Sequence, residues 1–332
     1  MLTLNSQVTS EHLYILARNE QLEVKTLEYA LRKIGIVPDS QAWRQFLDDM
    51  FLLLGITLLS VGIIFFFAYN WNDMEKFAKF GLLETGILAM ALFASIRGLE
   101  YLSSQAAILG ASILLGALLA VYGQTYQTGA DAFGLFVVWA ALILPWVLVS
   151  RFAPLWLLWL ILLNLGLGLF WEQVVVPNHH EIPIELFLLL FLLNGMALLI
   201  LEFNHKLEWL QGKWLGIILF ITTLTILIIP TLMTIVNFNI IWQDNQLFGL
   251  ATVLYILTTA FSLWYYRYQR HDLLLLAICL LGILITFTTL IGVSLALDEV
   301  ILFLLLAVIV IGQATLATKW LLKVQQIWQQ EE

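Results

Sequence analysis

The chain has 332 residues, of which 61% are hydrophobic and only 11% are charged, whereas an ordinary soluble domain carries roughly 25% charged residues. A soluble protein of this size buries at most about three quarters of its surface on folding, so it could not hide so much apolar surface, and lipid must cover the rest. The net charge of −8 excludes the broad basic face of a nucleic-acid-binding protein.

Residues 1–48 predict a small cytoplasmic helical region without a cleavable signal peptide. Its first helix ends before Gly35 and Pro38, and a second helix, capped by Asp39 or Ser40, continues into the membrane. The apolar faces of these two helices are Leu27, Ala30, Leu31 and Ile34, and Trp43, Phe46, Leu47 and Met50. Two interpretations stay open: a helical hairpin packed on the membrane face, or a docking site for a cytoplasmic protein partner.

Ten apolar stretches follow, and each is long enough to cross a bilayer core of roughly 30 Å, which takes about 20 helical residues. They predict an all-α, polytopic membrane protein of about ten transmembrane helices. The expected spans are 50–69, 77–96, 102–123, 132–150, 152–171, 182–201, 214–236, 246–266, 273–297 and 300–320. The resulting division is a first membrane half, 49–171, a second half, 172–320, and a cytoplasmic tail, 321–332.

The distribution of Lys and Arg predicts the orientation. With the N-terminus in the cytosol, all of the 15 Lys and Arg residues except Lys76 and Lys79 fall in cytoplasmic segments. Such an asymmetry is typical of the positive-inside rule. We therefore expect a multi-pass protein of the bacterial inner membrane with both termini in the cytosol.

Two stretches carry a resemblance to a known family. FFFAYNWNDMEKFAKFGLLE, residues 65–84, places Asn70 and Trp71 after the first span, and YGQTYQTGADAFGLFVVWAALILPWVLVSR, residues 122–151, leads into a tryptophan-proline span. Together they resemble the bacterial predicted-membrane-protein family called domain of unknown function 2157. The resemblance covers roughly residues 10–155. It implies a short helical N-terminal region followed by several membrane helices, and it implies no activity.

Under the predicted topology the polar parts of both stretches lie on the outer side, where adjacent hairpins would bring them together. Aromatic rings beside amides and carboxylates suit a polar, ring-shaped or sugar-like head group. The alternative is an ordinary interfacial belt, with Asn72 and Glu75 as a capping box and Asp131 as a helix cap. The candidate outer-face cluster is Asn70, Trp71, Asn72, Asp73, Tyr122, Gln124, Tyr126, Gln127 and Asp131.

Four polar residues fall inside the spans: Glu84, Asn164, Asn194 and Gln313. A carboxylate at the depth of Glu84 costs about 2.5–3.5 kcal/mol on insertion scales, so it indicates proton coupling, unless it is a neutral, hydrogen-bonded structural group. The three amides either join helices through hydrogen bonds or line a pathway. Small residues spaced four apart in the third span, Ser103, Ala107 and Ala111, predict close helix packing there.

No catalytic residue, cofactor site or metal site is predicted. Cys279 is the only cysteine, which excludes an intrachain disulfide and a cysteine metal cluster, and a metal site at His179 and His180 would need ligands from elsewhere. No nucleotide-binding loop or hydrolase motif is present. The expected function is a secondary carrier or flippase-like protein for a small polar or lipid-linked solute. A sensor or assembly scaffold that uses the N-terminal helices is the alternative, and an intramembrane enzyme has the least support.

Overall fold

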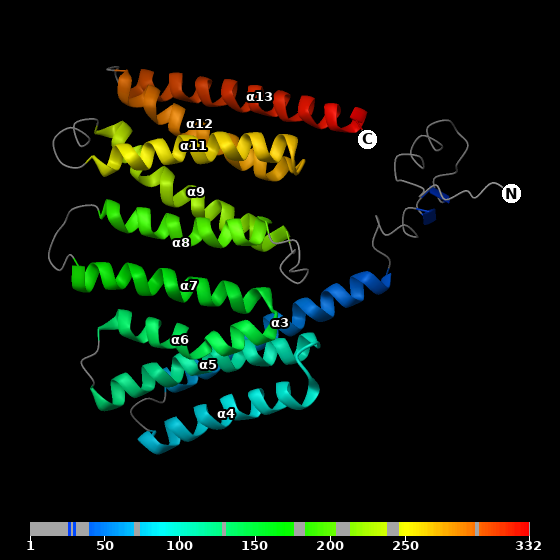
Figure 1. Ribbon diagram of the computed structural model, residues 1–332, viewed down its shortest axis with the longest axis vertical. Helices are drawn as coiled ribbons and strands as arrows, with labels where there is room; N and C mark the ends of the chain where they lie inside the picture. Colours follow the sequence, from blue (N-terminus) through cyan, green and yellow to red (C-terminus); the bar gives the residue numbers. More distant parts are fainter. Residues whose placement is uncertain are drawn as a thin grey trace. The chain divides into compact units, whose positions relative to one another are not determined.

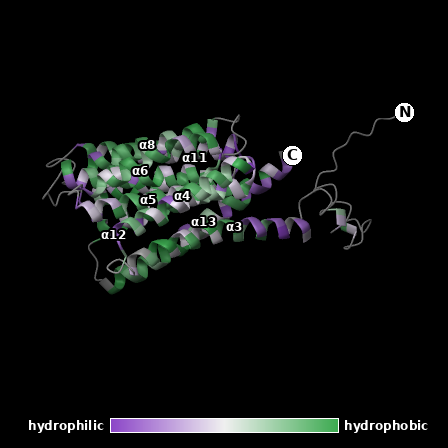
Figure 2. Cartoon of the chain, turned by 90° about the horizontal axis from the view of Figure 1, so that it is seen from below, coloured by the Kyte–Doolittle hydropathy of each residue, from purple (hydrophilic) through white to green (hydrophobic). Residues whose placement is uncertain are grey.

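The computed structural model describes residues 26–27, 29–30, 40–69, 74–127, 131–175, 183–203, 213–237, 246–295 and 299–331. Within these ranges, ten helices are long and apolar enough to cross a membrane (Figure 1). Apolar residues occupy most of each helix, and hydrophilic residues gather toward helix ends (Figure 2). The predicted fold class, an all-α polytopic membrane protein, is confirmed.

The helices fall close to the predicted spans. They are α3 Ser40–Tyr69, α4 Lys76–Arg97, α5 Leu102–Tyr126, α6 Ala132–Ser150, α7 Ala153–Phe170, α8 Ile184–Phe203, α9 Lys213–Val236, α11 Leu247–Tyr268, α12 Leu273–Ser294 and α13 Glu299–Glu331. A short π-helical segment, Trp171–Val175, prolongs α7. A sharp turn separates the fourth and fifth spans, because Arg151 ends α6 in the left-handed conformation and Pro154 lies at the start of α7.

Two helices, α3 and α13, are longer than their predicted spans by ten or more residues. α3 begins at Ser40, so the second N-terminal helix runs without a break into the first span, as expected. α13 continues to Glu331 rather than ending near 320. The extra turns of α13 have an apolar face in which Val324 is buried and Trp320 and Trp328 are partly buried, and this packing sustains a helix that hydropathy alone does not predict.

The first compact unit is Met1–Val121. Its core is formed by Leu83 of α4 and by Leu114 and Val121 of α5, with side chains of α3 against them. A Cβ added at Gly110 of α5 would lie 3.0 Å from both Ile56 Cγ1 and Met90 Sδ. More than half of this span is buried, at 56%, which agrees with the close packing expected of its small residues.

The second compact unit is Tyr122–Glu332. α6 packs on α7, α8 on α9, and α12 on α13, while α9 also contacts α11 and α12. α9 is therefore the central helix of this unit. The core around it contains Phe220, Leu227, Leu276 and Cys279.

Candidate functional site

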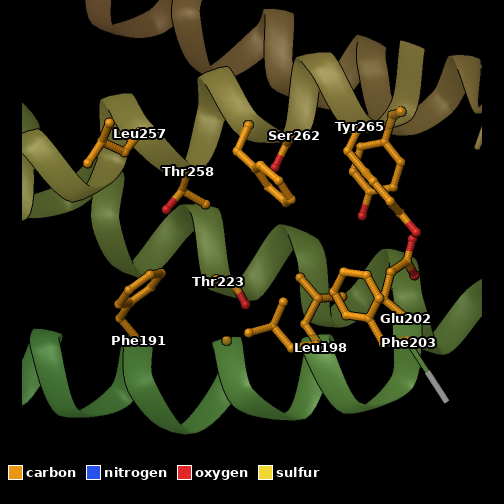
Figure 3. A pocket seen from close by; sticks show the side chains of 13 residues that line it. Phe191, Leu198, Glu202, Phe203, Thr223, Leu257, Thr258, Ser262 and Tyr265 are labelled. Carbon is orange, nitrogen blue, oxygen red and sulfur yellow. The ribbon is translucent and has the colours of Figure 1, made fainter. Parts of the chain in front are cut away.

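A cavity of about 290 Å³ lies between α8, α9 and α11 in the second unit. Figure 3 shows its side chains, which are mostly apolar, with a carboxylate at one end. Its lining includes the side chains of Thr223, Thr258 and Ser262. Thr223 donates to the carbonyl oxygen of Leu219 in its own helix at 2.7 Å, so its bonding to the backbone leaves an apolar methyl group to complete the wall.

The carboxylate belongs to Glu202, in the last turn of α8, and it forms an ion pair with Arg270 in the turn after α11. The Glu202 side chain is only 7% exposed, whereas that of Arg270 is 40% exposed. Burial by itself lowers the pKa of Arg270, but the hydrogen bond and the charge of Glu202 outweigh it and raise the pKa above its usual value. The guanidinium therefore stays charged at any physiological pH.

Aromatic rings surround this ion pair. The Tyr265 phenol lies beside the Glu202 carboxylate. The Tyr265 ring is stacked on Phe261, with centroids 5.9 Å apart and an interplanar angle of 13°, and it is 6.1 Å from the ring of Phe203. Tyr266 meets Tyr265 edge to face at 5.3 Å. The carboxylate thus lies in a largely aromatic environment, where its interaction with a cation is stronger than in water.

The turn that carries Arg270 is also tied to the end of α13. Trp328 Nε1 donates to the carbonyl oxygen of Arg267 at 3.1 Å, and the Trp328 ring meets His271 edge to face at 4.9 Å. The guanidinium of Arg267 lies 5.3 Å from the Trp320 ring. Contacts from α8 and α13 therefore hold the α11–α12 turn from two sides.

Two of the predicted intramembrane amides meet. Asn194 Nδ2 donates to Asn164 Oδ1 at 2.7 Å, and Asn164 Nδ2 lies 3.3 Å from Asn194 Oδ1. Each amide also donates to the carbonyl oxygen four residues earlier in its own helix, Leu160 or Leu190. This geometry is the helix-joining arrangement that the sequence left as one of two interpretations.

Gln313 does not join that pair. Its Oε1 accepts a hydrogen bond from Thr288 of α12 at 3.2 Å, while its Nε2 is buried without a partner among the residues that the structure describes. It lines a second cavity, of about 440 Å³, between α11, α12 and α13, whose other lining residues are apolar. The sequence analysis treated the three amides as one group, whereas the structure places them in two separate contacts, Asn164 with Asn194 and Gln313 with Thr288.

Glu84 lies on an exposed face of α4, and Lys79, five residues earlier, is buried. Contact between lipid tails and an exposed carboxylate in the middle of an apolar helix is energetically unfavourable. Glu84 therefore remains a candidate for contact with water or protein.

The outer-face cluster is described only in part. Asn70, Trp71, Asn72 and Asp73 lie outside the described residues. Tyr122 and Tyr126 are exposed, and their ring centroids are 4.9 Å apart. Gln124 and Asp131 are exposed, and Gln127 ends α5 with a φ of 44°. Whether the two stretches meet stays a prediction.

The local capping interpretations are wrong in detail. Glu75 occupies the N-cap position of α4 and makes no side-chain capping bond, whereas the capping box requires it at the third position of the helix. Asp131 is the N-cap residue of α6, but its side chain does not cap the helix. Instead, the amide nitrogen of Phe133 donates to Gln173 Oε1 at 3.2 Å, from the segment that prolongs α7. Gln173, from the segment that prolongs α7, therefore takes the place of a local side-chain cap.

No group of three or more metal-binding side chains occurs among the described residues, and His179, His180 and Glu181 lie outside them. The sequence analysis missed Glu202 and Arg270. Glu202 falls just beyond the predicted end of the sixth span, and Arg270 lies in the turn between the eighth and ninth. The signal available in the sequence was that Glu202 and Arg270, one acidic and one basic, are both predicted to lie at the same face of the membrane.

The family model described as predicted membrane protein (DUF2157) matches residues 21–156, so the resemblance seen in the two motifs is confirmed. No curated protein matches the chain, and no solved structure matches it. The cavity and the Glu202–Arg270 pair lie C-terminal to the matched residues.

Proposed function

We propose that this protein, whose residues 21–156 match the DUF2157 family of predicted membrane proteins, is a secondary carrier or flippase-like protein for a small polar or lipid-linked solute. The solute site is the cavity between α8, α9 and α11. The observation that carries the proposal is the buried Glu202, with its ion pair to Arg270 at the end of that cavity. Apolar pockets with a few convergent polar groups are the usual form of a small-molecule site.

The expected topology gives this site a direction. All Lys and Arg of the second unit lie near one set of helix ends or in the adjoining loops, and the positive-inside rule assigns that side to the cytosol of a bacterial cell. The Glu202–Arg270 pair then marks the cytosolic end of the cavity. The exposed Tyr122 and Tyr126 lie on the outer side, where the candidate cluster belongs.

Reconstitution into liposomes tests the carrier. Fluorescent lipids are added to both leaflets, and a membrane-impermeant reductant quenches those in the outer leaflet; a flippase-like protein exposes more than the outer half to quenching. Gly195 lines the cavity, and its added Cβ would meet only Phe191 and Thr223 atoms at 3.8–4.0 Å. Gly195→Phe should therefore fill the cavity and remove the activity.

Gly168→Phe is the matched control, because nothing lies within 4 Å of a Cβ at Gly168 on α7. Equal activity in the wild type and both variants would contradict a site in this cavity. A lack of activity for lipids and for small polar solutes trapped in the liposomes would contradict the carrier itself.

The scaffold alternative has one supporting observation. The first turns of α3 expose Trp43 and Phe46, at 54% and 57%, and their rings meet edge to face at 5.9 Å. A photoreactive residue in place of Trp43 separates the two functions. Crosslinking in cells to one specific protein would favour the scaffold, whereas crosslinking to lipid alone would favour an α3 that lies in the membrane interface.

A further inference from the structure

The Glu202 carboxylate uses only one of its two oxygen atoms in the ion pair. Oε2 contacts Arg270, while Oε1 is buried and has no hydrogen-bond partner among the described residues. A buried charged oxygen without a donor is costly, because it has lost water and gained nothing in exchange. The side chain is more than nine-tenths buried and lies at the cavity. Oε1 therefore lacks a hydrogen bond of good geometry, although the Tyr265 phenol lies beside the carboxylate, and a donor on a molecule bound at the charged end of the cavity would supply one.

The walls near Glu202 favour a cation as that donor. The rings of Phe203 and Tyr265 lie beside the carboxylate, and the ring of Phe261 is stacked on Tyr265. Aromatic faces attract ammonium groups, and the attraction increases when water is excluded. A carboxylate between aromatic rings is complementary to an ammonium group in both charge and shape, and it is repulsive to a second carboxylate.

The remainder of the cavity favours an apolar chain. It extends along α8 from Phe191 to Phe203, which is about 18 Å at the helical rise per residue. Phe191 and Leu257 line it at the end away from Glu202, and Leu198 lies one helical turn before Glu202. An apolar chain buried along this wall is stabilised by removal from water, whether it belongs to a lipid or to a soluble amphiphile.

The geometry points to a binding site for an amphiphile with an ammonium head group, in which the head group reaches Glu202 and the apolar chain lies between α8 and α11. This inference rests on the proposed carrier and names its substrate class. Arg270 occupies the carboxylate when no ligand is bound, and it is the more exposed partner. The guanidinium therefore competes with the ligand for Glu202.

Direct binding to the purified full-length protein in a neutral detergent tests the inference. The probes are dodecylammonium, a soluble cation whose nitrogen carries hydrogen-bond donors, lysophosphatidylethanolamine, a membrane lipid with an ammonium group, and dodecanoate, an anion of the same chain length. The wild type should bind at least one of the ammonium probes and should not bind dodecanoate. Binding of the lipid alone or of the soluble cation alone supports the site and identifies the source of its ligand.

Two variants have opposite expected effects. Glu202→Gln should weaken binding of the ammonium probe by about tenfold or more, as expected when an ionic contact is removed. Arg270→Gln removes the competing cation and should strengthen binding. A purely structural pair would weaken binding in both variants, and Arg270→Gln remains informative if Glu202→Gln does not fold.

Stronger binding of dodecanoate than of either ammonium probe, with loss of that binding in Arg270→Gln, would overturn the inference in favour of an anionic ligand. Weaker ammonium binding in Arg270→Gln would also overturn it. Binding in detergent requires no transport. If the protein binds an ammonium probe but shows no transport in liposomes, the result would contradict the carrier and would not contradict the binding site. Active liposomes without ammonium binding would contradict only the substrate class.

Discussion

Asn194 Nδ2 donates to Asn164 Oδ1 at 2.7 Å and joins α7 to α8 in the middle of their apolar lengths. Asn194 is almost fully buried, at 2% exposure. Because each amide also bonds to its own helix backbone, part of its polarity is satisfied even before the helices meet. The bond between the amides therefore adds specificity to the contact at a modest gain in stability.

A double-mutant cycle measures this contact. Asn164→Leu and Asn194→Leu should each destabilise the protein, because each leaves the other amide without its partner. The double variant should be more stable than the sum of the two losses predicts, with a coupling energy of about 0.6 kcal/mol and at most about 1.7 kcal/mol. Unfolding in mixed micelles gives the free energies.

Thr222→Val is the control for that cycle, because among the residues that the structure describes the Thr222 hydroxyl bonds to the carbonyl oxygen of Ile218 in its own helix. It should lower the stability by less than either asparagine variant. Strictly additive losses in the cycle would show that the two amides do not act together.

The packing of α5 predicts a second effect. A Cβ at Gly110 would lie 3.0 Å from Ile56 Cγ1 and Met90 Sδ, so a larger residue must displace side chains of α3 and α4. Gly110→Val should lower the free energy of unfolding by about 1–3 kcal/mol through overpacking. Gly81→Val is the matched control on α4, because a Cβ at Gly81 meets nothing within 4 Å. Thermal unfolding of the purified variants in detergent compares them, and equal stability would contradict the close approach.

The sequence predicts the helices of this fold far better than it predicts their contacts. Each span is a continuous apolar run, so length and hydropathy place α6 at 132–150 to the residue. The extension of α13 could not be predicted in this way, because it depends on Trp328 reaching the Arg267 carbonyl oxygen 61 positions away in the chain. Hydropathy reports the transfer of a segment to lipid and says nothing about which helices are neighbours.

The same limit applies to the candidate site. Residue type at mid-membrane depth grouped Asn164, Asn194 and Gln313 together, but Asn164 and Asn194 bond to each other, whereas Gln313 bonds to Thr288. Glu202 was missed because it lies in the last turn of α8, where a charged residue is ordinary. Only the packing of α8 against α11 shows that this carboxylate is buried and faces a cavity.

The attachment of α13 to the α11–α12 turn can be tested by hydrogen exchange. Trp328→Phe keeps a ring beside His271 but removes the hydrogen bond to the Arg267 carbonyl oxygen, which is worth about 1 kcal/mol. Backbone amides in the last turns of α13 should exchange faster than in the wild type. Trp214→Phe serves as the control, since Trp214 is 41% exposed on α9. Unchanged exchange in both variants would show that the hydrogen bond from Trp328 does not stabilise the end of α13.

The membrane orientation can be tested with the cysteine that the chain already contains. Cys279 is fully buried in α12, so a membrane-impermeant maleimide should give little background, and a single introduced cysteine reports its own compartment. Lys76 and Gln329 are both exposed. On intact cells Lys76→Cys should label, whereas Gln329→Cys should label only after permeabilisation, because the positive-inside rule places the other Lys and Arg residues in the cytosol. Labelling of both positions from the same side would require an even number of crossings between them, and it would move the Glu202–Arg270 pair away from the side on which the proposed carrier meets the cytosol.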